Sequence, residues 1–163
     1  MIYKDIEFKL TDNFISKYKG KQPQWGPLGF FTYKRSYARD KGNGRTEEFW
    51  ETCQRVVEGT FLIQKLHCKQ HHLTWDERRA QQSAQEMFRR MFEFKFLPPG
   101  RGLWAMGTEF VIEKSSAPLY NCGFISTKDI RNDLAFPFVW LMDMSLMGVG
   151  VGFDTLGAAI EFY

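Results

Sequence analysis

Apolar residues recur every three to four positions in two stretches of the chain, and this spacing predicts two amphipathic helices. The first is expected to begin at Thr46 and to run to about residue 66. The second is expected over residues 74–97, because Thr74 and Glu77 have the spacing of a capping box and two prolines follow. The predicted core positions are Phe49, Cys53, Val56, Val57 and Phe61 in the first helix, and Ala80, Ala84, Met87, Phe88, Met91 and Phe92 in the second.

Shorter elements are expected around these two helices. Thr11 or Asp12 can cap a short helix, which the glycine at position 20 would end. Residues 30–34 fit a short strand, and residues 100–107 contain three glycines, which predict a tight connection. The front of the chain is therefore predicted to be mostly helical.

The pattern changes near the end of the chain. Residues 119–125 are apolar and extended, whereas residues 148–153 alternate glycine with valine and then phenylalanine. Between them, residues 129–147 are apolar over a length that fits a helix, with Ser126 or Thr127 as its N-cap. Strand, helix and strand make a βαβ unit, whose parallel strands need a crossover of about this length.

Length and composition fit one ordinary domain, because 44% of the 163 residues are hydrophobic. We predict a mixed α/β chain, with a mostly helical region over residues 1–117 and the start of an α/β domain over residues 118–163. The net charge of +3 does not by itself indicate a nucleic-acid partner. No run of 18 apolar residues is present and no secretory signal precedes the three cysteines, so we expect a cytoplasmic protein without a membrane span.

Cys122 lies on the first predicted strand of the βαβ unit, and Gly148, Gly150 and Gly152 lie at or near the second. A thiol beside bare backbone suits a pocket in which sulfur faces a ligand that rests on the main chain. The glycine spacing matches neither the dinucleotide-binding fingerprint nor the P-loop. Residue type alone also allows a buried cysteine that acts as a small apolar side chain and glycines at a close packing point, so both interpretations stay open.

Several motifs, in order along the chain, resemble the adenosylcobalamin-dependent (class II) ribonucleotide reductases, and in particular the monomeric ribonucleoside-triphosphate reductases. They are Trp25-Gly26-Pro27, the segment from Phe96 to Trp104, Asn121-Cys122 with the segment from Ile125 to Lys128, the segment from Pro137 to Met144, and the segment from Gly148 to Asp154. The resemblance covers roughly residues 21–157. It implies that the βαβ unit is the first part of a ten-stranded α/β barrel, incomplete in this chain.

The resemblance implies reduction of ribonucleoside triphosphates to 2′-deoxyribonucleotides for DNA synthesis, through a thiyl radical generated from adenosylcobalamin and with a thioredoxin-type reductant. Cys122 matches one of two cysteines that deliver electrons to the substrate and end as a disulfide, and its partner is expected outside this chain. Asn121, Gly150 and Gly152 are expected to contact the substrate. The radical-bearing cysteine and most of the cobalamin site have no match here, so we expect no activity without the remaining barrel. Either a second polypeptide supplies that barrel or the chain is a truncated gene product.

A histidine-rich segment has a simpler interpretation than metal binding. His67 and His71 have the i, i+4 spacing of a metal pair, with Cys68 and His72 beside them. No further ligand completes a set nearby, so a solvated helix end is favoured and no metal site is predicted.

Basic side chains support two alternative functions. The segment 33–45 interleaves aromatic and basic residues and could contact single-stranded nucleic acid, although a solvated loop is favoured. Arg101 could bind a phosphate, but a structural arginine bound to main-chain carbonyls is favoured. The alternatives to a reductase are a non-catalytic nucleotide-binding or regulatory remnant that uses Arg35, Arg39 and Arg101, and a basic module that binds single-stranded nucleic acid.

Overall fold

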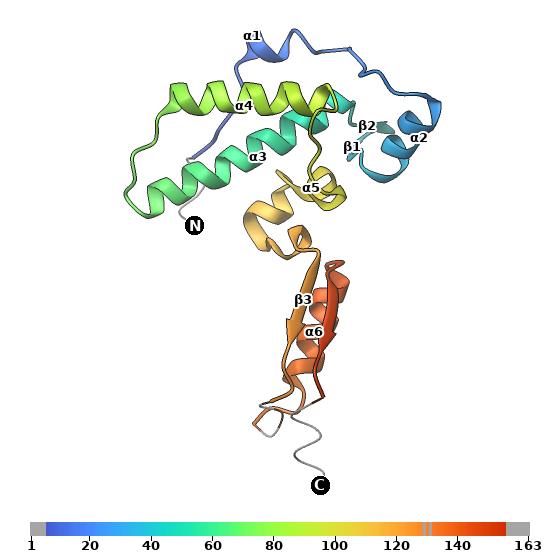
Figure 1. Cartoon of the computed structure of the whole chain (residues 1–163), viewed down its shortest axis with the longest axis vertical. Helices are drawn as coiled ribbons and strands as arrows, with labels where there is room; N and C mark the ends of the chain where they lie inside the picture. Colours follow the sequence, from blue (N-terminus) through green and yellow to red (C-terminus); the bar gives the residue numbers. More distant parts are fainter. Residues whose placement is uncertain (1–5, 129, 131, 156–163) are drawn as a thin grey trace.

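The computed structural model describes residues 6–128, 130 and 132–155. A mostly helical part leads into a βαβ unit that extends away from it (Figure 1). The mixed helical and sheet composition agrees with the predicted class. In chain order the elements are α1 (Asp12–Ile15), α2 (Pro27–Ser36), β1 (Asp40–Gly42), β2 (Arg45–Thr46), α3 (Phe49–Gln70), α4 (Glu77–Phe92), α5 (Gly100–Ala105), the π-helical turn η1 (Phe110–Lys114), the 3-10 turn η2 (Ala117–Leu119), β3 (Cys122–Ile125), α6 (Phe136–Leu146) and β4 (Gly150–Phe153).

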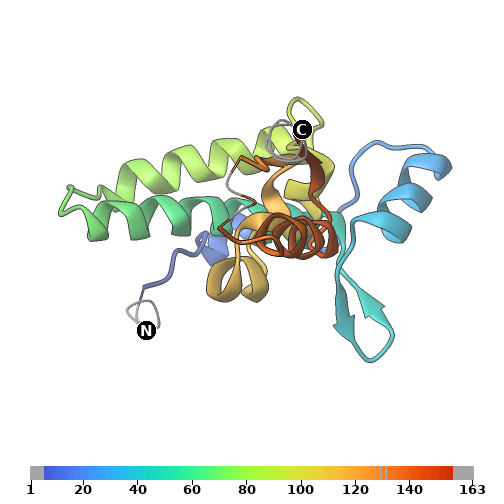
Figure 2. The same ribbon diagram turned by 90° about the horizontal axis from the view of Figure 1, so that it is seen from below.

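The core lies mainly between α3 and α4, which run side by side (Figures 1 and 2). Every predicted core position is buried except Met87, which is partly buried. Phe8 joins this core from the N-terminal side and stacks on Phe61 with ring centroids 5.2 Å apart. The three-to-four spacing therefore identified the buried faces of both long helices correctly.

The start of α3 differs from the prediction. Thr46 belongs to β2, which pairs with β1 in a two-stranded hairpin that projects from the helical part (Figure 2). The helix begins at Phe49, because Glu48 and Glu51 form a capping box in which each side chain accepts from the other residue's main chain. Glutamate is a less common N-cap than threonine, and the prediction at Thr46 was wrong for that reason.

The start of α4 also differs. Asp76, rather than Thr74, is the N-cap, and its carboxylate accepts a hydrogen bond from the Arg79 amide at 3.0 Å. The predicted capping box at Thr74 is therefore wrong. The helix ends at Phe92, before the two prolines, because Phe94 adopts a left-handed conformation with φ of 55°.

Two further segments are helical where other structure was predicted. Residues 30–34 lie within α2 rather than in a strand, since Pro27 sits in the first turn of that helix, where its restricted φ favours helix formation. The Tyr33 hydroxyl then reaches the α3 region, where it lies 2.7 Å from Thr52 Oγ1. Residues 100–107 are not only a connection, because they contain the short helix α5.

Arg55 of α3 forms a largely buried ion pair with Glu47 and also bonds the chain after α4. The Arg55 guanidinium donates to both carboxylate oxygens of Glu47, at 2.7 and 2.9 Å, and to the Leu103 carbonyl at 2.8 Å. Burial opposes ionisation of Glu47, but the hydrogen bonds and charge of Arg55 outweigh it and lower the pKa of this carboxyl. Close backbone packing supports the same junction, since a Cβ on Gly59 would lie 2.6 Å from the Gly107 nitrogen.

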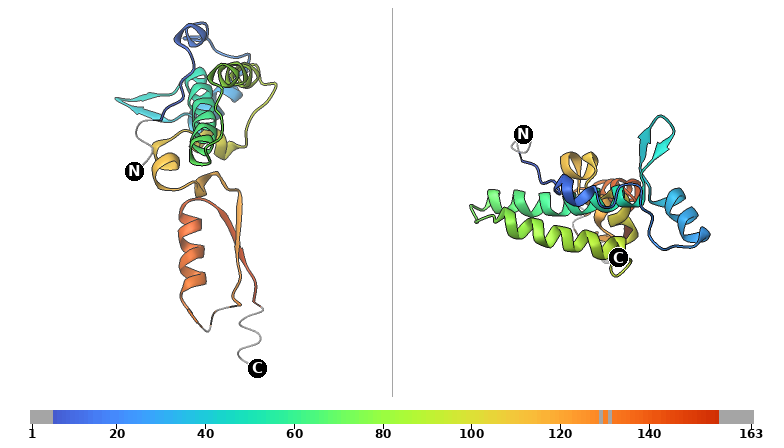
Figure 3. Two further views of the ribbon diagram at one scale, coloured as in Figure 1. Left: turned by 90° about the vertical axis from the view of Figure 1, so that its left-hand side faces the viewer. Right: turned by 90° about the horizontal axis from the view of Figure 1, so that it is seen from above.

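In the side view of Figure 3, the strands β3 and β4 lie on one side of the βαβ unit and α6 on the other. The residues described include no helix of the length and apolar character needed to cross a membrane.

Candidate active site

The two strands of the βαβ unit are parallel and adjacent, as predicted. Cys122 pairs with Gly150, and Phe124 pairs with Gly152. Side chains alternate between the faces of a sheet, and paired residues of parallel strands share a face, so these four residues lie on one face.

The opposite face of the sheet is covered by α6. A Cβ on Gly123 would lie 3.0 Å from the Trp140 ring and 3.3 Å from a Val149 methyl group. Val149 is buried as part of this packing. The face that carries Cys122 is therefore the one that α6 leaves open.

The thiol lies directly beside bare backbone. The Cys122 side chain is exposed, and its Sγ lies 3.8 Å from the position that a Cβ on Gly150 would take. The Gly150 amide donates to the Asn121 carbonyl at 2.9 Å, which aligns the two strands at this point. A Cβ on Gly152 would meet no atom within 4 Å. The structure thus brings together the four residues predicted for the site, and their contacts with a substrate stay a prediction.

Phe124 was not among the predicted site residues. Its ring is 63% exposed, on the same face as Cys122 and two residues further along β3. An aromatic ring of this exposure beside an open glycine position provides an apolar wall for a flat or apolar ligand group. The alternation of a strand, applied to Cys122, would have identified it from the sequence.

The two strands are also tied together at their carboxyl ends. The Thr127 hydroxyl lies 3.0 Å from both the main-chain oxygen and a carboxylate oxygen of Asp154, and the Thr127 amide donates to that carboxylate at 3.3 Å. Thr127 is 3% exposed. The prediction that Ser126 or Thr127 caps the following helix is therefore wrong, because the threonine is used to join β3 to the end of β4.

The crossover helix is shorter than predicted. α6 begins at Phe136, where the Asp133 carboxylate accepts from the amides of Ala135 and Phe136 at 3.0 Å. Pro137 occupies its first turn, which proline favours. Residues 129 and 131, within the predicted helix, lie outside the described residues.

Much of α6 is exposed although the helix is apolar around its circumference. The exposed apolar side chains are Phe136, Phe138, Val139, Met142 and Leu146. A helix with this composition is normally buried on all sides. The outer face of α6 therefore has the character of a surface that further protein covers.

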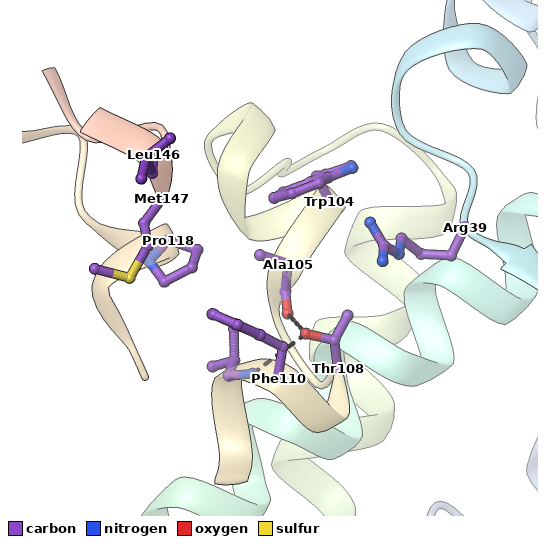
Figure 4. Close-up of a pocket in the computed structure, with 9 residues that line it drawn as sticks. Arg39, Trp104, Ala105, Thr108, Phe110, Pro118, Leu146 and Met147 are labelled. Atoms are coloured by element: carbon purple, nitrogen blue, oxygen red, sulfur yellow. Dashed lines mark hydrogen bonds between the residues drawn. The ribbon is translucent and has the colours of Figure 1, made fainter. Parts of the chain in front are cut away.

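A cavity of about 290 Å³ lies where the helical part meets the βαβ unit (Figure 4). The Arg39 guanidinium lies 4.9 Å from the centre of the Trp104 ring on one side, and Leu146 and Met147 from the end of α6 lie on the other. The Thr108 hydroxyl in its wall already donates to the Ala105 carbonyl at 2.7 Å. The cavity contains Arg39, which was predicted only for the nucleotide-binding alternative, and none of the residues predicted for the reductase site.

Most basic side chains of segment 33–45 have partners within the chain. Lys34 binds the Glu48 carboxylate at 2.9 Å and Lys41 forms an ion pair with Glu51. The Arg35 guanidinium lies 5.7 Å from the Phe31 ring centre. The two ion pairs reduce the positive charge that the segment could offer to nucleic acid.

The histidine-rich segment and Arg101 were the other features singled out in the sequence. The rings of His67 and His71 lie with centroids 4.4 Å apart at the end of α3, and within the described ranges no group of three or more potential ligands could hold a metal ion. Arg101 donates a hydrogen bond to the Gly148 main-chain carbonyl, which is the structural role that the sequence favoured.

Residues 10–108 match the ribonucleotide reductase alpha domain, and because this match spans more than half of the chain, the chain belongs to that family. The chain is 49% identical over 154 residues to a protein of Dictyostelium discoideum described as a probable adenosylcobalamin-dependent ribonucleoside-triphosphate reductase, with 93% of this chain and 20% of that protein covered. It is 47% identical over 160 residues to the adenosylcobalamin-dependent ribonucleoside-triphosphate reductase of Euglena gracilis, with 93% and 21% covered.

A solved structure gives the same result. The crystal structure of a B-12-dependent (class II) ribonucleotide reductase matches with a TM-score of 0.72 and 30% identity, over 90% of this chain and 23% of that chain. The family resemblance seen in the sequence motifs is thus confirmed. The chain spans only about a fifth of the length of the relatives that it matches.

Proposed function

We propose that this chain is the N-terminal portion of a ribonucleoside-triphosphate reductase, which converts ribonucleoside triphosphates to 2′-deoxyribonucleotides for DNA synthesis. The observation that carries the proposal is the exposed thiol of Cys122 on the open face of the sheet, beside the bare backbone of Gly150. The matched relatives are named as reductases of this kind, which supports the same conclusion.

Residues 1–117 would then form a helical region, and residues 118–163 would begin a ten-stranded α/β barrel. The exposed apolar side of α6 and the two-stranded sheet support this arrangement, because both need further elements to cover them. The remaining barrel is supplied by the rest of the protein or by a second polypeptide. Three unpaired cysteines are consistent with a cytoplasmic setting and a thioredoxin-type reductant.

In the proposed reaction, the ribose rests on the backbone of Gly150 and Gly152 with its 2′-hydroxyl toward Cys122. The thiol gives its proton to the leaving hydroxyl, which departs as water when the C2′–O bond breaks. Cys122 and a second cysteine outside this chain then form a disulfide, and the two electrons and remaining proton that they release form the new C2′–H bond. Asn121 holds Gly150 in place through its carbonyl.

Adenosylcobalamin fits this chain only in part. The best-formed cavities among the described residues, of about 290–500 Å³, are small for a corrin ring with its nucleotide. The described residues therefore do not build the cofactor site by themselves, and we expect it mostly on the remaining barrel. When bound, the cofactor supplies the organic radical with which this class of chemistry begins.

Complementation tests the proposal. The chain is mixed with a purified C-terminal reductase fragment, adenosylcobalamin, a reducing dithiol and a ribonucleoside triphosphate, and deoxynucleotide is measured by chromatography. We expect product with the natural chain, none with Cys122→Ser, and product with the control Cys68→Ser, because Cys68 lies at the far end of α3.

Other outcomes favour the alternatives. Product that survives Cys122→Ser would refute the role of this thiol. Binding of the nucleoside triphosphate without turnover would favour a nucleotide-binding remnant. Binding of a single-stranded oligonucleotide that weakens steeply with salt would favour the nucleic-acid module.

A further inference from the structure

Arg101 connects the helical part to the βαβ unit at one specific atom. Its Nη2 donates to the carbonyl oxygen of Gly148, which lies 47 residues further along the chain. Its Nη1 lies 2.9 Å from the position that a Cβ on Gly148 would take. Gly148 has a φ of 82°, a backbone conformation that favours glycine, and an added Cβ would also displace the guanidinium.

The bound carbonyl belongs to the turn that ends α6. The Gly148 amide donates to the Ser145 carbonyl at 2.8 Å, and the Val149 amide donates to the Met144 carbonyl at 3.0 Å, which is the pattern of a Schellman motif. The next amide, that of Gly150, makes the first hydrogen bond between the strands. One residue therefore separates the carbonyl held by Arg101 from the start of β4.

The start of β4 is also the backbone against which the thiol lies. Gly150 pairs with Cys122, and its Cβ position is 3.8 Å from Sγ. A shift or loosening of Gly148 would move Gly150 relative to this sulfur, since only Val149 lies between them. Hydrogen bonds from a charged donor are stronger than those between neutral groups, so the guanidinium is suited to hold this turn.

We propose that Arg101 is a positioning residue for the Cys122 thiol: it holds the Gly148 carbonyl and thereby fixes the first residues of β4 beside the sulfur. The contact itself is independent of the reaction. The consequence for catalysis rests on the function proposed above.

Hydrogen exchange followed by mass spectrometry tests the contact in the full chain. In Arg101→Ala, the amides of residues 150–153 should exchange roughly tenfold to a hundredfold faster, the effect of losing one charged hydrogen bond on local opening. The control Arg78→Ala removes an exposed arginine of α4 and should leave these rates unchanged.

Two results would overturn the proposed contact. One is unchanged exchange in residues 150–153 of Arg101→Ala. The other is an equal acceleration in the buried amides of α3, which would mean a general loss of stability. If Arg101→Ala does not fold, Arg101→Lys compared with Arg78→Lys takes its place: faster exchange in residues 150–153 supports the proposal, and equal exchange refutes it.

Turnover then tests the positioning of the thiol. In the complemented reductase, Arg101→Ala should lower kcat roughly tenfold with little change in KM, and Arg101→Lys should restore part of the loss. Faster exchange with normal kcat would refute positioning of the thiol and leave the contact standing. If the natural chain gives no turnover, the proposed function fails, and the exchange rates alone decide whether Arg101 fixes β4.

Discussion

Gly152→Ala separates the fold of the sheet from its proposed use as a substrate surface. Gly152 lies on the open face of β4, opposite Phe124. An added Cβ would meet no atom within 4 Å, and the backbone of Gly152 does not have a positive φ. The substitution should therefore be accepted by the fold without rearrangement.

The substitution is expected to raise the stability of the fold slightly and to lower the activity. Replacing a glycine where alanine fits stabilises a protein by about 0.4–1 kcal/mol, chiefly by reducing the entropy of the unfolded chain. The same methyl group stands where the substrate is proposed to rest on bare backbone. Displacing reacting atoms by about 1 Å can lower a rate roughly a hundredfold, so we expect a tenfold to hundredfold loss in kcat/KM.

Two measurements on the same variant check this prediction. Urea unfolding followed by circular dichroism should show unchanged or slightly higher stability, and deoxynucleotide formation in the complemented reductase should fall. Gly20→Ala is unsuitable as a control because Gly20 has a φ of 74°, so Gln64→Ala on the exposed side of α3 serves instead. Full activity in a stable Gly152→Ala protein would refute the assignment of this face to the substrate.

Two further predictions concern stability. Gly59→Ala should lower the free energy of unfolding in urea by about 1–3 kcal/mol despite the better helix propensity of alanine, because its Cβ would meet the backbone of Gly107 at 2.6 Å; a more stable variant would contradict this packing. The lowered pKa of Glu47 means that its stabilising effect is fully present above the ordinary value of 4.5 and is lost as the pH falls through the lower pKa of the folded state. Unfolding measured from pH 6 down to about pH 2 should therefore show a smaller acid loss in Glu47→Gln than in the natural chain, and an equal loss would contradict the role of the Arg55 pair.

Local patterns predicted much of the helical part. The spacing of apolar residues located α3 and α4 and their buried faces, because an amphipathic stripe depends only on neighbouring turns of one helix. Helix starts were less predictable, since several polar residues near each start could serve as the cap. The choice of Glu48 over Thr46 depended on the hairpin that holds Thr46 in β2.

The candidate site was also predicted only in part from the sequence. The βαβ order and the pairing of a thiol strand with a glycine strand followed from the sequence, because strand alternation and crossover length are short-range rules. The sequence could not predict the hydrogen bonds from Thr127 to Asp154 and from Arg101 to Gly148, which span 27 and 47 residues. Such contacts exist only once packing has brought the two segments together.

The sequence by itself determined the family, the two long helices and the parallel strands that carry Cys122 and Gly150. Only the tertiary structure decided which face of the sheet is open, because that depends on where α6 packs, and Gly123 lies against Trp140 on the closed side. It also decided that Arg101 holds the turn before β4 rather than a phosphate. Periodicity depends only on residues close together in the sequence. The open face of the sheet and the hydrogen-bond partner of Arg101 depend on how the whole chain packs.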